Sequence, residues 1–176
     1  MNIWTLRLDK DGDCEQHLHE SKPFITSLHG TCIIESEAAV SEYNNLKDRI
    51  ADLGKKELGE KLLKVKQIAG IEDKKKCVPN LLNWLKRMKI GDIVFSACED
   101  SIAICEVLSH AEEHKRADNS VSPKRFVKII KTIPLDDAKK LVPTSCQHRV
   151  FHNPKTLERV AKISHKEELQ AFLKKL

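Results

Sequence analysis

The chain has 176 residues, of which 40% are hydrophobic and 32% charged, a balance that suits one apolar core beneath a charged surface. Mean hydropathy is −0.42, no apolar run approaches the roughly 20 residues of a membrane-spanning helix, and the first residues lack a secretory signal, so we expect a cytoplasmic protein with no membrane partner. The net charge of +5 permits a polyanionic partner without requiring one.

The first half of the chain predicts two short strands followed by helices. Asn2–Leu8 alternates apolar and polar residues, which is typical of a strand. Lys22–Leu28 predicts a second short strand that ends at Gly30. The stretch Ile34–Leu58 holds two helical patterns, and Glu60–Ile68 holds another.

The second half begins with the clearest helical pattern, Val78–Met88. Asp92–Cys98 and Ile102–Leu108 then predict the two strands of a hairpin. Ser109–Lys124 is polar and charged, so we expect a mobile loop there, and Arg125–Ile133 predicts the next strand.

The remaining elements are short. Leu135–Leu141 predicts a helix after Pro134, and Leu157–Val160 follows a polar closing segment. Ser164 and Glu167 have the spacing of a capping box and predict a last helix at about residues 165–176. The fold class is therefore α+β, with about five or six strands curled into a small barrel and helices packed outside.

No internal repeat or dividing linker is visible in the sequence. We therefore predict a single domain over residues 1–176, with a helical insertion at about residues 35–76.

The order of these elements resembles the EVE and YTH domains of the PUA-like superfamily, and the resemblance covers most of the chain. The positions that match in order are Trp4, Phe24–Ser27, Trp84, Gly91–Asp92, Ile104–Val107 and Ile133–Pro134. The chain departs from the pattern at Ile104–Cys105, where a glycine is usual, and has no tryptophan on the second strand.

The resemblance implies a barrel that holds a flipped, modified nucleobase. The chain is similar to N-terminal modules of modification-dependent restriction enzymes of the McrBC type. This implies a DNA-binding module that recognises a methylated base and targets a restriction system to it. The chain itself would be neither an enzyme nor a cofactor-binding protein, because cleavage or NTPase activity would lie in a C-terminal motor or nuclease domain or in another subunit.

A reader of one base must unstack it, which costs a few kcal/mol, and aromatic side chains repay about 1–3 kcal/mol per stacked base. The candidate pocket residues, aromatic walls and hydroxyl edge readers together, are Trp4, Phe24, Thr26, Ser27, His29 and Trp84. Both tryptophans also lie on apolar faces, so a role in the core remains open for them.

Affinity for a nucleic-acid backbone needs cations and polar groups near the phosphates. The candidates that flank the predicted strands are Lys86, Arg87, Lys89, Lys115, Arg116, Lys124, Arg125, His148, Arg149 and Asn153. The alternative is an ordinary solvated surface.

Three other functions remain open. An RNA-binding domain of the EVE or ASCH type differs in reading the 2′-hydroxyl. A nuclease of the PD-(D/E)xK class is suggested only by the letters at Glu72–Lys74 and Glu113–Lys115, in polar, loop-like contexts. A zinc site is suggested by Cys105, His110 and His114, or by Cys146, His148 and His152, without a CxxC pair. The nuclease and the zinc site are two forms of one alternative, a small catalytic domain. The third alternative is a plain interaction domain. We predict no metal and no catalytic residue.

Overall fold

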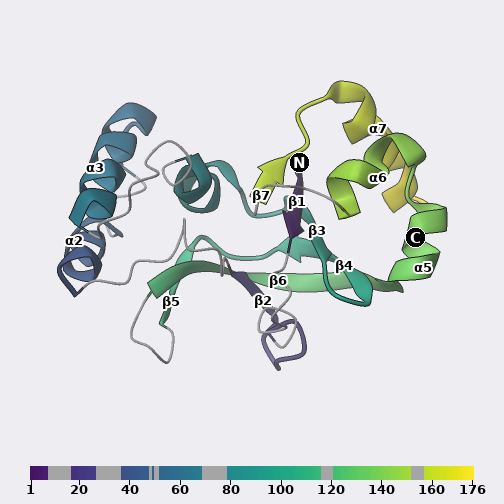
Figure 1. Ribbon diagram of the computed structural model, residues 1–176, viewed down its shortest axis with the longest axis horizontal. Coiled ribbons are helices and arrows are strands. Elements are labelled where there is room, and N and C mark those ends of the chain that lie inside the picture. The colour runs from purple at the N-terminus through teal and green to yellow at the C-terminus, as the bar shows by residue number, and fades with distance from the viewer. Residues whose placement is uncertain are drawn as a thin grey trace. The chain divides into compact units, whose positions relative to one another are not determined.

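The computed structural model describes residues 1–7, 17–26, 37–47, 49, 52–68, 79–115, 121–151 and 157–176. The chain divides into two compact units (Figure 1). The first comprises Met1–Ile25, Lys89–Ser109 and Phe126–Leu176, and the second comprises Thr26–Met88 and His110–Arg125.

The first unit is built on six strands, namely β1 (Ile3–Arg7), β2 (Phe24–Thr26), β3 (Ile93–Ala97), β4 (Ser101–Val107), β6 (Val121–Pro134) and β7 (Leu157–Arg159). Their order is β2-β6-β4-β3-β1-β7. β1 and β3 are parallel, whereas β3–β4, β4–β6 and β1–β7 are antiparallel. The last residue of β2 and the first five of β6 belong to the second unit.

Three helices of the first unit pack on this sheet: α5 (Leu135–Leu141), α6 (Thr144–Phe151) and α7 (Ile163–Leu173). Their apolar side chains form one core with alternate residues of the strands, including Ile3, Phe95, Ile104, Val150 and Phe172. The predicted α+β class is confirmed by this mixed sheet and the helices that pack on it.

The long strand β6 carries a bulge. Ile104 of β4 faces Lys131, but the next residue, Cys105, faces Ile129. Ile130 is therefore the extra residue of β6, and it is 45% exposed. A bulge of this kind increases the local bend and twist of a strand, which suits a sheet that curls.

The second unit contains a helical pair, α2 (Glu37–Lys47) and α3 (Lys55–Ile68), within the predicted insertion. Apolar residues recur at helical spacing and are buried, as at Tyr43 and Leu46 in α2 and at Leu58 and Leu62 in α3. No helix in the described part of the chain is both long and apolar enough to cross a membrane.

The polar stretch after β4 is not the loop that the sequence predicts. β5 (Glu112–Lys115) pairs antiparallel with residues 121–124 of β6. Glu112 lies opposite Lys124 and His114 opposite Ser122, and opposite charges on facing positions stabilise such a ladder. The hydrophobic periodicity that identifies strands is absent here, because the pairing rests on backbone hydrogen bonds and polar side chains.

Two predictions near the C-terminus are corrected. The segment before β7 contains α6 (Thr144–Phe151), a helix that the sequence pattern did not predict. α7 begins at Ile163, its preceding residue is Lys162, and no side chain caps it, so the predicted capping box at Ser164 and Glu167 does not form.

Candidate nucleic-acid interface

The Gly-Asp pair before β3 is an anchor within the first unit. Gly91 has a positive φ of 80°, which residues with side chains rarely adopt. The carboxylate of Asp92 is buried. It accepts hydrogen bonds from the backbone N–H of Asn2 (2.7 Å), the indole N–H of Trp4 (2.9 Å) and the backbone N–H of Lys89 (3.0 Å). The pair therefore ties the start of β1 to the start of β3.

Two opposing effects act on the pKa of Asp92. Burial disfavours the charged form and raises the pKa, whereas the hydrogen bonds from Asn2, Trp4 and Lys89 favour it and lower the pKa. Together the hydrogen bonds outweigh burial, so the pKa lies below its ordinary value of 3.8. Trp4 is a fully buried residue whose N–H is already in use, which corrects the prediction that it lines a base pocket.

Phe24, another predicted pocket residue, belongs to an aromatic cluster in the first unit. Its ring stacks on that of His17, with the centroids 4.2 Å apart and the planes 22° apart. Phe126 meets Phe24 edge-on at 6.2 Å. Phe24 is itself buried, whereas Phe126 is half-buried. Of the two phenylalanines, Phe126 is therefore the more accessible.

In the second unit, Thr26 is buried and bound to the start of β6. Its hydroxyl donates to the C=O of Pro123 at 2.9 Å. Because that bond uses the one hydroxyl proton of Thr26, Ser122 is the donor in the 2.9 Å contact between the two hydroxyl oxygens. The Thr26 hydroxyl is thus committed to the start of β6.

We expect Thr26→Val to lower the free energy of unfolding by about 1–3 kcal/mol, because it leaves the buried Pro123 C=O and Ser122 hydroxyl short of a partner. The matched control is Thr132→Val, at an exposed position of β6, which should stay within about 0.5 kcal/mol. Urea denaturation of both variants measures the difference. Equal stabilities would show that the Thr26 hydroxyl is not committed to these bonds.

Trp84 lies in η1 (Asn83–Arg87), a π-helical turn that continues the α-helical residues 79–82. The N–H of Met88 donates to Asn83 at 3.0 Å, one residue further back than in an α-helix. The C=O of Trp84 therefore lacks that partner. It accepts instead from the guanidinium of Arg125, through Nε at 2.9 Å and through Nη2.

Arg125 is only 1% exposed, and two of its N–H groups are bound to the Trp84 carbonyl. It is not positioned to contact phosphate, which corrects that prediction. Sequence alternation held a signal that was missed: Val121, Pro123 and Arg125 share one face of a strand, and all three are buried.

The indole N–H of Trp84 is in the opposite situation to that of Trp4. Both side chains are 0% exposed. The Trp4 N–H donates to Asp92, whereas the Trp84 N–H has no acceptor among the residues that the structure describes. An unpaired buried donor costs about 1–3 kcal/mol, so this group calls for an explanation.

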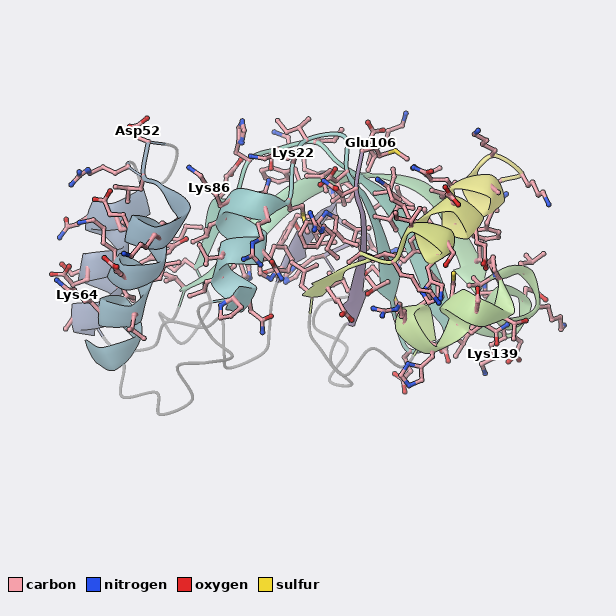
Figure 2. All side chains as sticks on the ribbon, turned by 90° about the horizontal axis from the view of Figure 1, so that it is seen from above. Lys22, Asp52, Lys64, Lys86, Glu106 and Lys139 are labelled. Carbon is pink, nitrogen blue, oxygen red and sulfur yellow. The ribbon has the colours of Figure 1, made fainter. Side chains whose placement is uncertain are left out.

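The predicted backbone-contacting residues differ in accessibility. Lys89, Lys115 and His148 are exposed, and Lys124 is half-buried. Lys86, labelled in Figure 2, donates to the C=O of Leu53 at 2.9 Å. Two more of these residues are bonded within the protein. The guanidinium of Arg87 donates a hydrogen bond to the side chain of Asn83 (2.9 Å), and Arg149 forms an ion pair with Glu158 (3.2 Å). Four predicted site residues lie outside the described residues: Ser27, His29, Arg116 and Asn153.

Some residues of the metal and nuclease alternatives lie within the described ranges, whereas His152 lies outside them. Across the described ranges, no three His, Cys, Asp or Glu side chains are grouped to hold a metal. Burial raises the pKa of Cys105 to about 12, which keeps it a thiol. Glu113–Lys115 lies on β5 rather than in a loop, while Glu72–Lys74 lies outside the described residues.

The sequence matches no protein-family model and no curated protein. Among solved structures, it is similar to the X-ray crystal structure of protein Atu2648 from Agrobacterium tumefaciens, with 12% sequence identity and a TM-score of 0.45. The match covers 98% of this chain and 93% of that chain.

Proposed function

We propose that this chain is a nucleic-acid-binding module that holds one modified base of DNA, unstacked from its duplex, against Trp84 in the second unit. The observation that carries the proposal is the indole N–H of Trp84, which is buried and has no acceptor in the described part of the chain. Every nucleobase presents acceptors on its edge, so a bound base supplies the missing partner.

The surroundings of Trp84 support this role. Its indole ring is 0% exposed, so a base stacks on it only after local opening, a contact worth about 1–3 kcal/mol per base. Arg125 holds the backbone of Trp84, and Thr26 holds Ser122 and Pro123 on the same strand as Arg125. Trp84 and Thr26, both predicted pocket residues, are thus each attached to the first five residues of β6.

A methyl group on the base adds about 0.8 kcal/mol when buried against apolar atoms, which is the physical basis for preferring a modified base. In the proposed setting, the module directs a restriction system to methylated DNA, and the motor or nuclease belongs to another domain or subunit. Because Trp84 is fully buried, admission of a base requires local opening of the second unit, so association should be slower than simple docking.

The test compares the two tryptophans. Wild-type protein is titrated, at fixed salt, with matched duplexes that carry methyladenine, methylcytosine or no modification at one position. We expect a preference of about fourfold, the equivalent of about 0.8 kcal/mol for one buried methyl group. Trp84→Phe keeps an aromatic ring but removes the unpaired N–H, so it should weaken binding of the methylated duplex by about 0.5–1.5 kcal/mol, the value of one hydrogen bond. Urea denaturation accompanies the titration, because the smaller ring leaves a cavity at a fully buried position.

Trp4→Phe is the matched control, because it removes an indole N–H that is already bonded to Asp92. It should cost about 1–3 kcal/mol of stability and leave the affinity unchanged under conditions where the protein is folded. Wild-type affinity in folded Trp84→Phe would rule out this site. Equal affinity of wild-type protein for all duplexes would reject the proposal, and single-stranded RNA would then be the next ligand to titrate.

A further inference from the structure

One end of the sheet in the first unit carries an exposed apolar side chain. Alternate residues of β4 and its continuation face the same side of the sheet, and these are Ile102, Ile104, Glu106 and Leu108. Ile102 and Ile104 lie in the core with α5, α6 and α7, but Leu108 is 50% exposed. Figure 1 shows these helices gathered toward the opposite end, where the N–H of Leu135 donates to Asp100.

Phe126 lies opposite Leu108. The N–H of Leu108 donates to the C=O of Phe126 at 2.9 Å, and the preceding pair, Val107 and Val127, is in antiparallel register. Directly opposed side chains of an antiparallel pair lie on the same face, about 5 Å apart at Cβ. Leu108 and Phe126 thus form one continuous apolar surface.

The neighbouring chain segment widens this surface. Gly91 donates its N–H to the C=O of Val107 at 2.9 Å, which places the segment of Lys89 and Ile90 beside the end of β4. Ile90 is 52% exposed, and Lys89 is exposed as well. Two adjacent segments therefore present half-exposed aliphatic side chains here.

Lysine residues lie at the same end of the sheet as these apolar side chains. Lys128 lies two residues after Phe126 and opposite Glu106. The N–H of Val127 donates to Pro23 at 2.9 Å, which brings the adjacent Lys22 to the same end; Figure 2 labels Lys22 and Glu106.

Lys22, Lys89 and Lys128 are exposed and form no ion pair with the residues that the structure describes. Of the nearby carboxylates, that of Glu20 is bound to His17 at 2.9 Å.

The open patch is the set Ile90, Leu108, Phe126, Lys22, Lys89 and Lys128. We propose that it binds an unpaired nucleic-acid strand, whose bases lie on the apolar side chains and whose phosphates face the three lysines. Exposed hydrophobic side chains beside cations are the chemistry that such strands require, and the carboxylate of Glu106, opposite Lys128, offsets part of the positive charge there. The inference rests on the proposed function, because both assume a nucleic-acid ligand. It adds a binding surface for an unpaired strand to the site proposed for a single base.

The test uses an unmodified, fluorescently labelled oligothymidylate and fluorescence anisotropy at fixed salt. The variant Lys89→Ala/Ile90→Ser changes the patch, and Lys162→Ala/Ile163→Ser is its matched control, because Lys162 is exposed and Ile163 is 72% exposed elsewhere in the first unit. We expect the patch variant to bind about tenfold more weakly, and the control to stay within about twofold of wild type.

A second variant, Leu108→Ser, should weaken binding without changing the dependence on salt, whereas Lys89→Ala alone should reduce the slope against log salt by about 0.7. Equal losses in the patch and control variants, or no binding by wild-type protein, would overturn the inference. Oligothymidylate carries no modified base, so a strand-binding protein without preference for methylated duplexes would overturn only the proposed function. A methyl preference without strand binding would overturn only this inference.

Discussion

Asp92→Ala is expected to lower the free energy of unfolding by more than about 3 kcal/mol. The substitution removes the acceptor of the Trp4 indole N–H and of the backbone N–H groups of Asn2 and Lys89. The bond of the Trp4 indole is buried and those of the two backbone N–H groups are part-buried, and a buried donor left unpaired costs about 1–3 kcal/mol. Urea denaturation measures the loss. The matched control is Asp100→Ala, at an exposed turn position of the same unit, which should stay within about 0.5 kcal/mol.

The same carboxylate makes stability depend on acid. Its pKa is about 3.8 in the unfolded chain and lower in the folded protein. Its contribution is therefore fully present above pH 3.8 and is lost as the pH falls through the folded pKa. Asp92→Asn, which keeps the shape but cannot titrate, should flatten this part of the stability curve. Identical acid dependence in wild type and Asp92→Asn would contradict the assignment.

Arg125→Met is expected to cost about 3 kcal/mol, the second large effect. Arg125 is buried and donates to the Trp84 carbonyl from two nitrogens. Methionine retains much of the apolar stem but leaves that carbonyl without these donors. Arg125→Lys should recover only part of the loss, because an ammonium cannot reproduce the two-pronged geometry of a guanidinium.

Lys115→Met is the matched control for a cation on the surface. Lys115 is exposed on β5, so its replacement should leave stability within about 0.5 kcal/mol. If Lys115 contacts phosphate, the salt slope of binding falls by about 1, whereas Arg125→Met should leave that slope unchanged. A reduced slope with normal stability in Arg125→Met would place Arg125 at the nucleic-acid surface instead.

Local pattern predicted much of the secondary structure because burial imposes a period on the sequence. The β3–β4 hairpin follows the apolar runs at Asp92–Cys98 and Ile102–Leu108, and α5 has the predicted bounds, Leu135–Leu141. The pattern failed in two short elements. β5 is polar and pairs through its backbone, and α6 has eight residues with Cys146 and Val150 buried one turn apart, too short a repeat to identify a helix in the sequence.

The candidate site was predictable only in part. Trp84 and Thr26 were identified from residue type and order, but their partners lie far away in the sequence. Thr26 bonds Ser122 and Pro123, which are 96 and 97 residues further along the chain. The partner of Trp84, Arg125, is 41 residues further along. A charged residue in a polar stretch is typical of a solvated surface. Only the long-range pairing of β6 shows that the Arg125 guanidinium is buried on a carbonyl.

The amino-acid sequence by itself determined the α+β class, most strands and helices, and the Gly91–Asp92 position, because side-chain size, periodicity and turn chemistry act over short distances. The tertiary structure alone decided which tryptophan has its N–H paired. Trp4 and Trp84 look alike in sequence, as aromatic residues among apolar neighbours. Hydrogen bonding distinguishes them, since it depends on the chain segment that the fold brings alongside: Asp92 for the N–H of Trp4, and no described acceptor for that of Trp84.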